Sequence, residues 1–107
     1  MIYTFDRFQL DEQRWELRHG AARIRLAPRE LELLHYLMRH RDRVVSKEEL
    51  IQQVWSGIPV GAGALLRSMS LLRRALGQRD ARDGIIRTYT RRGYRFCVSV
   101  RGDAADT

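Results

Sequence analysis

Residues 62–77 read AGALLRSMSLLRRALG, and residues 85–98, after a short polar connection, read IIRTYTRRGYRFCV. In the first stretch, apolar residues recur at three- and four-residue spacing, which predicts an amphipathic helix from about Ala62 to Leu76. Gly77 is the kind of residue that commonly follows the last turn of a helix. One side of this helix is apolar and carries Leu65, Met69, Leu72 and Leu76. The opposite side is polar and basic and contains no acidic residue.

The second stretch predicts a β-hairpin. Strands are expected over Ile85–Thr90 and Tyr94–Val100, with Arg91, Arg92 and Gly93 at the turn between them. Glycine permits the positive φ that a tight turn needs. A helix with a basic outer side followed by a hairpin with arginines at its turn is how a winged helix presents itself to DNA. The helix then enters the major groove, and the arginines suit the strongly negative minor groove.

The charge distribution points to the same stretch. The chain has a net charge of +7, and residues 61–100 alone hold nine arginines and two aspartates. Residues 1–60 contribute a net charge of +1, and residues 101–107 contribute −1. A concentrated basic field predicts a polyanionic partner, most commonly nucleic acid. Nineteen of the twenty basic residues are arginine, which suits forked contacts to phosphate and guanine but is also what a GC-rich genome produces.

The rest of the chain predicts one small α+β domain. Alternating apolar and polar residues over 1–26 predict three or four short antiparallel strands. Pro28 suits the first turn of a helix, and Ser46 with Glu49 forms a capping box at the start of a second helix. We therefore expect a domain over residues 1–100, with residues 101–107 as a disordered tail or the start of a linker.

Composition argues against several other classes. Cys97 is the only cysteine and the three histidines are scattered, so neither an internal disulfide nor a metal site is expected. No apolar run approaches the ~20 residues of a membrane span, and membrane-surface binding lacks an apolar face. No nucleophile–base pair or phosphate-binding loop occurs, so we expect no enzymatic activity, no cofactor and no small-molecule ligand. A cytoplasmic location follows from the cysteine usage.

Five motifs in order resemble the OmpR-like winged-helix family, the DNA-binding domains of bacterial response regulators and of ToxR/CadC-like membrane regulators. They are Leu26–Leu31 (LAPREL), Arg43–Leu50 (RVVSKEEL), Val54–Trp55, Leu72–Gly77 (LRRALG) and Ile86–Phe96 (IRTYTRRGYRF). The resemblance implies a winged helix-turn-helix with an N-terminal four-stranded antiparallel sheet, a three-helix core and a C-terminal β-hairpin wing. It further implies sequence-specific binding of double-stranded DNA by a transcription regulator. The third helix (about 62–76) would dock in the major groove and the wing (about 86–98) at the minor groove.

The expected DNA contacts come from the second helix, the third helix and the wing. They are Lys47, Trp55, Arg67, Ser68, Ser70, Leu71, Arg74, Thr88, Thr90, Arg91, Arg92 and Tyr94. The resemblance implies that Lys47 and Trp55 touch phosphate, and that Leu71 faces the groove. It also implies that one loop contacts RNA polymerase, which here is Ser56, Gly57, Ile58, Pro59 and Val60. Tandem dimers on direct repeats are a further family expectation.

Two departures from the family leave an alternative open. The residues before the third helix are Gly61-Ala62-Gly63-Ala64, so no side-chain cap is expected there. Leu66 and Leu71 are apolar where polar residues are commoner. Either Leu71 meets a thymine methyl, or the two leucines form a protein–protein patch. The second case gives the alternative function, a winged-helix protein-interaction module with only weak, non-specific affinity for DNA.

The position of the first strand bears on the parent protein. Met1 stands directly before this strand, which looks more like a ToxR/CadC-type one-component regulator than a response regulator, where the domain is C-terminal. Met1 could instead be a cloning start. A membrane would be reached only through another part of the parent.

Overall fold

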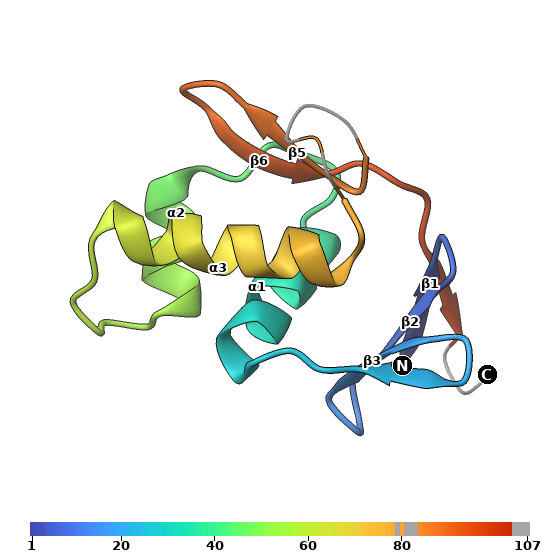
Figure 1. Cartoon of the computed structure of the whole chain (residues 1–107). Coiled ribbons are helices and arrows are strands. Elements are labelled where there is room, and N and C mark those ends of the chain that lie inside the picture. Colours follow the sequence, from blue (N-terminus) through green and yellow to red (C-terminus); the bar gives the residue numbers. More distant parts are fainter. Residues whose placement is uncertain (79, 81–83, 104–107) are drawn as a thin grey trace.

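An N-terminal sheet, three helices and a C-terminal hairpin follow one another along the chain (Figure 1). The computed structural model describes residues 1–78, 80 and 84–103. The elements are β1 Ile2–Phe5, β2 Phe8–Asp11, β3 Glu16–His19, β4 Ala22–Ile24, α1 Pro28–Arg39, α2 Lys47–Val54, α3 Ala62–Ala75, β5 Ile86–Tyr89, β6 Gly93–Phe96 and β7 Arg101–Asp103. The predicted α+β class and winged helix-turn-helix architecture are confirmed. Among the described residues, no helix is long and apolar enough to cross a membrane.

Helix α1 is the centre of the core. It contacts α2, α3 and β6, and its residues Leu33, Leu34, Leu37 and Met38 are fully buried. Pro28 occupies the first turn, as the sequence predicts, and the preceding Ala27 offers no hydrogen-bonding side chain. Three aromatic rings join the N-terminal sheet to the hairpin, because the ring centre of Phe5 in β1 lies 5.5 Å from that of Phe8 in β2 and 5.1 Å from that of Phe96 in β6.

Helix α2 begins with half of the predicted capping box. The Ser46 hydroxyl accepts a hydrogen bond from the Glu49 N–H at 3.1 Å. The Glu49 carboxylate, however, accepts hydrogen bonds from the Arg43 guanidinium at 2.6 and 2.9 Å and from the Tyr36 hydroxyl. These bonds, led by those from Arg43, lower the pKa of Glu49 to about 2. The carboxylate thereby ties α2 to α1 and to the loop between them.

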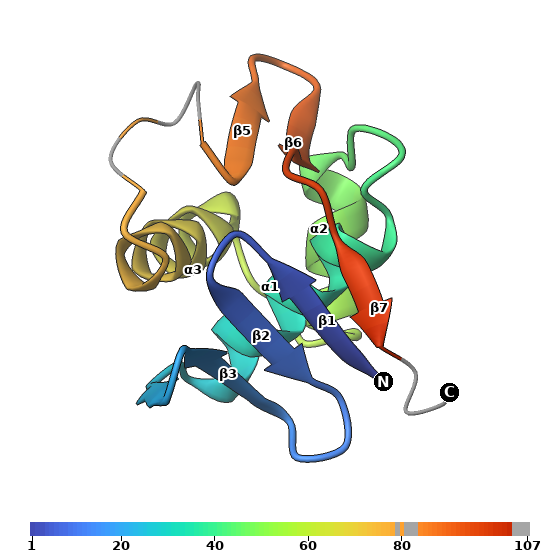
Figure 2. The same cartoon turned by 90° about the vertical axis from the view of Figure 1, so that its right-hand side faces the viewer.

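The N-terminal sheet has the antiparallel strand order β4-β3-β2-β1-β7 (Figure 2). Strand β7 pairs with β1, with Arg101 opposite Thr4 and Gly102 opposite Tyr3. The sheet therefore has one strand more than the family resemblance implies, and the expected tail is corrected for residues 101–103. Such a short strand is held by backbone pairing to the free edge of β1. A side-chain pattern in the sequence does not predict pairing of this kind. Residues 104–107 lie outside the described residues.

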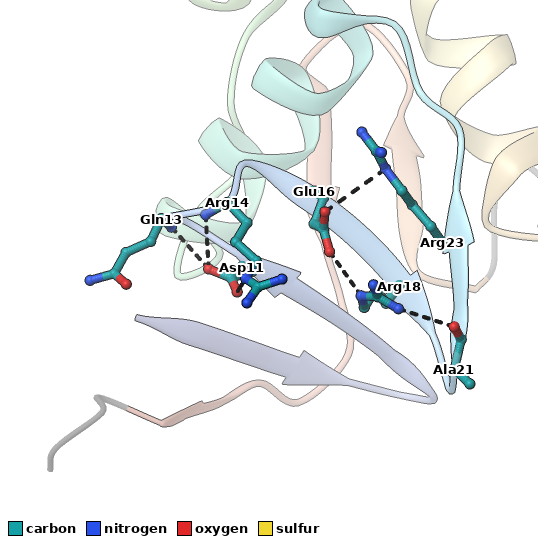
Figure 3. A network of polar contacts seen from close by, with 7 residues as sticks. All are labelled: Asp11, Gln13, Arg14, Glu16, Arg18, Ala21 and Arg23. Carbon is teal, nitrogen blue, oxygen red and sulfur yellow. Dashed lines mark hydrogen bonds and ion pairs between the residues drawn. The ribbon is translucent and has the colours of Figure 1, made fainter.

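Charged side chains of the N-terminal sheet are paired locally (Figure 3). Glu16 lies 2.8 Å from Arg18 and 3.9 Å from Arg23. The Asp11 carboxylate accepts hydrogen bonds from two backbone N–H groups of the following turn at 3.0 and 3.1 Å, and it lies 3.9 Å from the Arg14 side chain. Part of the arginine charge of the N-terminal sheet is therefore balanced by neighbouring carboxylates.

Candidate nucleic-acid interface

Helix α3 has one buried and one exposed side. Leu65, Met69 and Leu72 are at most 1% exposed, and the helix packs on α1 and α2. We call the exposed residues Arg67, Ser70, Leu71 and Arg74 the basic face. The helix contains no acidic residue, and the arginines of its last turn complement the negative end of the helix dipole. The surface that α3 leaves open is therefore positively charged.

The end of α3 positions the hairpin. Gly77 adopts φ +74°, its N–H donates to the Arg74 carbonyl at 3.1 Å, and the Gln78 N–H donates to the Arg73 carbonyl at 2.9 Å. This Schellman pair ends the helix where the sequence predicts. The Gln78 side chain then accepts from the Ile86 N–H at 2.8 Å and donates to the Ile86 carbonyl at 2.6 Å. Strand β5 is thus fastened to the C-terminal end of α3.

A second attachment joins the hairpin to the chain before α2. Val45 and Tyr94 exchange two backbone hydrogen bonds of 2.8 and 2.9 Å. A Cβ atom at Gly93 would lie 1.9 Å from the Val45 carbonyl oxygen, and Gly93 has φ +138°. The sequence predicts Gly93 as a turn residue, but it is the first residue of β6. Its lack of a side chain is needed as much for the close approach of Val45 as for its own φ.

Arg73 anchors the hairpin from α3. Its guanidinium donates to the Ile86 carbonyl at 3.0 Å and to the Thr88 hydroxyl at 2.7 Å, and it lies 5.5 Å from the centre of the Tyr94 ring. Burial lowers the pKa of Arg73 and raises the pKa of Tyr94. Arginine nevertheless remains charged at neutral pH. Thr88 and Tyr94 therefore belong to the packing between helix and hairpin.

The turn of the hairpin is exposed. Thr90, Arg91 and Arg92, which we call the wing tip, connect β5 to β6. The Arg92 N–H donates to the Tyr89 carbonyl at 2.8 Å, and Arg91 adopts φ +66°. The turn thus lies one residue earlier than predicted. The wing tip points away from the N-terminal sheet (Figure 1).

The arginines of the basic face and the wing tip are available to a partner. Among the ion pairs within residues 1–78, 80 and 84–103, none involves Arg67, Arg74, Arg91 or Arg92. A groove separates α3 from the hairpin and is lined by Leu66, Met69, Ser70, Arg73, Arg74, Gly77, Gln78 and Tyr94. Lys47, at the start of α2, is also exposed. Exposed cations therefore lie on α3, at the wing tip and at the start of α2, and Arg74 also lines the groove between α3 and the hairpin.

Three expected contact residues are buried instead. Trp55 is 5%, Ser68 is 7% and Tyr94 is 2% exposed. Trp55 packs in the core, and the Arg29 guanidinium lies 5.5 Å from its ring centre. Ser68 follows Leu65 by one helical turn, on the flank of the buried side of α3. We therefore do not propose these three side chains as DNA contacts.

The sequence did not predict which residues attach the hairpin to the helices. Val45, Arg73 and Gln78 bond to hairpin residues that lie at least eight positions further along the chain, and no spacing pattern reveals such partners. The clearest sequence indication of such an attachment is Val45, a β-branched residue that favours strands and stands directly before the Ser46 cap of α2.

The loop between α2 and α3, Ser56–Val60, displays an apolar side chain. Ser56 and Gly57 have φ values of +45° and +86°. The Ile58 N–H donates to the Trp55 carbonyl at 2.9 Å, and the Ile58 side chain is 51% exposed. A shallow groove beside it is lined by Glu48, Ile51, Gln52, Gly57, Ile58, Pro59 and Val60.

Leu66 and Leu71 lie on different sides of α3. They are five positions apart, which places one about 140° from the other around the helix. Leu66 lines the groove toward the hairpin, and Arg67 and Arg74 lie between the two leucines around the helix. The two therefore do not form the single apolar patch on which the alternative function depends.

Known proteins share both sequence and fold with this chain. The family described as "Transcriptional regulatory protein, C terminal" matches residues 21–96. The phosphate regulon transcriptional regulatory protein PhoB of Escherichia coli is 32% identical over 88 residues, which cover 81% of this chain and 38% of PhoB. Transcriptional activator CadC of Escherichia coli is 31% identical over 86 residues, covering 79% of this chain and 17% of CadC. The chain thus spans less than half the length of either relative.

Solved structures extend the similarity to nearly the whole chain. The DNA-binding domain of Escherichia coli CadC superposes with a TM-score of 0.81 at 27% identity, covering 94% of each chain. The Klebsiella pneumoniae RstA DNA-binding domain, solved in complex with its RstA box, shares the fold. Its TM-score is 0.76 at 19% identity, covering 89% of this chain and 95% of that one. This chain belongs to the transcriptional regulatory protein C-terminal family, the OmpR-like winged-helix class that its sequence resembles.

Proposed function

We propose that this domain binds double-stranded DNA sequence-specifically as part of a bacterial transcription regulator. The observation that carries the proposal is the basic face of α3, an exposed helix surface without acidic residues whose arginines have no ion-pair partner within the described part of the chain. The wing tip adds two exposed arginines on the hairpin that packs against this helix. The similar CadC domain is described as DNA binding, and the similar RstA domain was solved with its DNA box. We place its site of action in the cytoplasm, where a bacterial chromosome lies.

The two basic surfaces have different tasks. Helix α3 enters the major groove, where Arg67 and Arg74 reach guanine edges or phosphates and Ser70 contacts either. The wing tip meets the minor groove and its phosphates, together with Lys47 on the flank of α2. Base-edge contacts give specificity, whereas phosphate contacts give affinity that weakens with salt.

The test begins with selection of binding sites from random duplexes. Affinity is then measured for a selected site and for its scrambled sequence at several salt concentrations. Lys47, Arg91 and Arg92 on phosphates predict a slope of about −2.7 in a plot of log affinity against log salt, and its magnitude reaches about 4.5 only if Arg67 and Arg74 also contact phosphate. Replacing Arg91 and Arg92 by alanine should reduce the magnitude of this slope by about 1.8. Equal affinity for selected and scrambled DNA would overturn sequence-specific binding, and an unchanged slope would remove the wing tip from the interface.

We further propose that the Ser56–Val60 loop contacts RNA polymerase. Support comes from Ile58, whose side chain is 51% exposed at the surface of a short loop. An Ile58→Ser variant should bind the selected site as wild type does but activate transcription less in a purified system. Equal activation by both proteins would contradict this role.

Two copies of the domain should occupy direct repeats in tandem. Titration of a duplex that carries two selected sites in the same orientation should give a two-to-one complex with cooperative binding. Independent binding to the two sites would argue against contacts between the copies.

A further inference from the structure

An exposed leucine stands within the basic face of α3. Leu71 is 39% exposed and lies four residues after Arg67 and three before Arg74, the spacings that make side chains neighbours on a helix. Leu66 and Leu71 are the two large apolar side chains that α3 exposes, and Leu71 is the one that belongs to the basic face.

The only apolar group that base edges present in the major groove is the 5-methyl group of thymine. A leucine held between arginines matches this pattern, because arginine pairs with guanine edges or phosphates while the leucine covers the methyl group. A protein partner would require a larger continuous apolar surface, and Leu66 lies about 140° away around the helix. Charge also favours DNA, since Arg67 and Arg74, which flank Leu71 on the helix surface, have no ion-pair partners among the described residues.

We propose that Leu71 contacts the 5-methyl group of a thymine in the major groove, so that the preferred duplex carries thymine at the position facing it. The proposal rests on the proposed function and names the base that this part of the face selects. It makes Leu71 a specificity-determining residue, whereas Leu66 on the groove side of α3 has no such role.

Deoxyuridine tests the proposal because it removes only the methyl group and keeps base pairing. Each thymine of a selected site is replaced in turn, and affinity is measured for the wild type, Leu71→Ala and Leu66→Ala. Burial of one methyl group is worth about 0.8 kcal/mol, which converts to about a fourfold loss for wild type at one position. Leu71→Ala should lose this sensitivity, whereas Leu66→Ala, the same change on the other side of the helix, should retain it.

The outcomes separate this inference from the function on which it rests. If no duplex is selected, the proposed function itself fails. If sites are selected but wild type tolerates deoxyuridine at every position, or no thymine is enriched, the role of Leu71 is overturned while DNA binding stands. The role is overturned equally if Leu71→Ala keeps the wild-type sensitivity. The deoxyuridine measurement with the wild-type protein tests the proposal even if the Leu71→Ala variant fails to fold.

Discussion

Gly93→Ala should detach the wing from the helical core. The new Cβ atom would lie 1.9 Å from the Val45 carbonyl oxygen, 2.7 Å from the Val45 carbonyl carbon and 2.9 Å from the Ser46 Cα atom. All three are backbone atoms, so no side-chain movement relieves the overlap. The two hydrogen bonds between Val45 and Tyr94 must therefore break or stretch.

The size of the effect follows from these contacts. Two backbone hydrogen bonds contribute about 1 kcal/mol each, and a non-glycine residue at φ +138° adds about 1–3 kcal/mol of strain. We expect a loss of about 3–5 kcal/mol in the free energy of unfolding, measured by urea denaturation. For a domain of this size, 1 kcal/mol lowers the melting temperature by about 4–8 °C, so the variant should melt well below wild type.

Gly63→Ala is the matched control for this experiment. Among the described residues, nothing lies within 4 Å of a Cβ atom built at Gly63, which is in the first turn of α3. Alanine favours a helix over glycine, so this variant should gain up to about 1 kcal/mol. If Gly93→Ala stays within about 0.5 kcal/mol of wild type, which is the usual range for neutral surface changes, the account of the wing attachment is refuted.

Further predictions concern the Glu49 network and the Arg73 anchor. Because the folded pKa of Glu49 is lowered from about 4.5 to about 2, its contribution to stability is full above pH 4.5 and fades toward pH 2. The difference in free energy of unfolding between wild type and Glu49→Gln should shrink across this window, and a constant difference would contradict the ion pair. Arg73→Met should lose about 2 kcal/mol in urea denaturation and weaken binding to selected and scrambled DNA alike. Arg73→Lys should not restore stability because lysine lacks the fork that reaches Ile86 and Thr88 together, and full restoration would show that charge alone suffices.

Local patterns in the sequence predicted the elements of the fold. The Leu/Met spacing and Gly77 defined both ends of α3, because helix period and glycine capping are properties of neighbouring residues. Strand β7 was missed because three residues paired through their backbone leave no side-chain pattern. For the same reason, the close approach of Gly93 to Val45 could not be read from the sequence.

The sequence predicted the charge of the candidate site better than the exposure of its individual residues. The concentration of arginines over residues 61–100 predicted a basic surface there, and Arg67, Arg74, Arg91 and Arg92 are all exposed, whereas their contacts with DNA stay a prediction. The burial of Ser68 depends on how far a neighbouring helix covers the flank of α3, which the angle around the helix does not reveal. Arg73 and Arg74 are adjacent and chemically identical, yet only tertiary structure separates the half-buried anchor from the exposed cation.

The specificity lost by Arg67→Ala tests the central claim most directly. Affinities for a selected site and for its scrambled sequence are measured at one salt concentration. The control is Arg23→Ala on the N-terminal sheet, which removes the same single positive charge as Arg67→Ala. The account predicts that Arg67→Ala lowers affinity for the selected site by about 1–3 kcal/mol more than for scrambled DNA, whereas Arg23→Ala leaves their ratio unchanged. Equal losses on both duplexes for Arg67→Ala would contradict the reading of DNA sequence by α3.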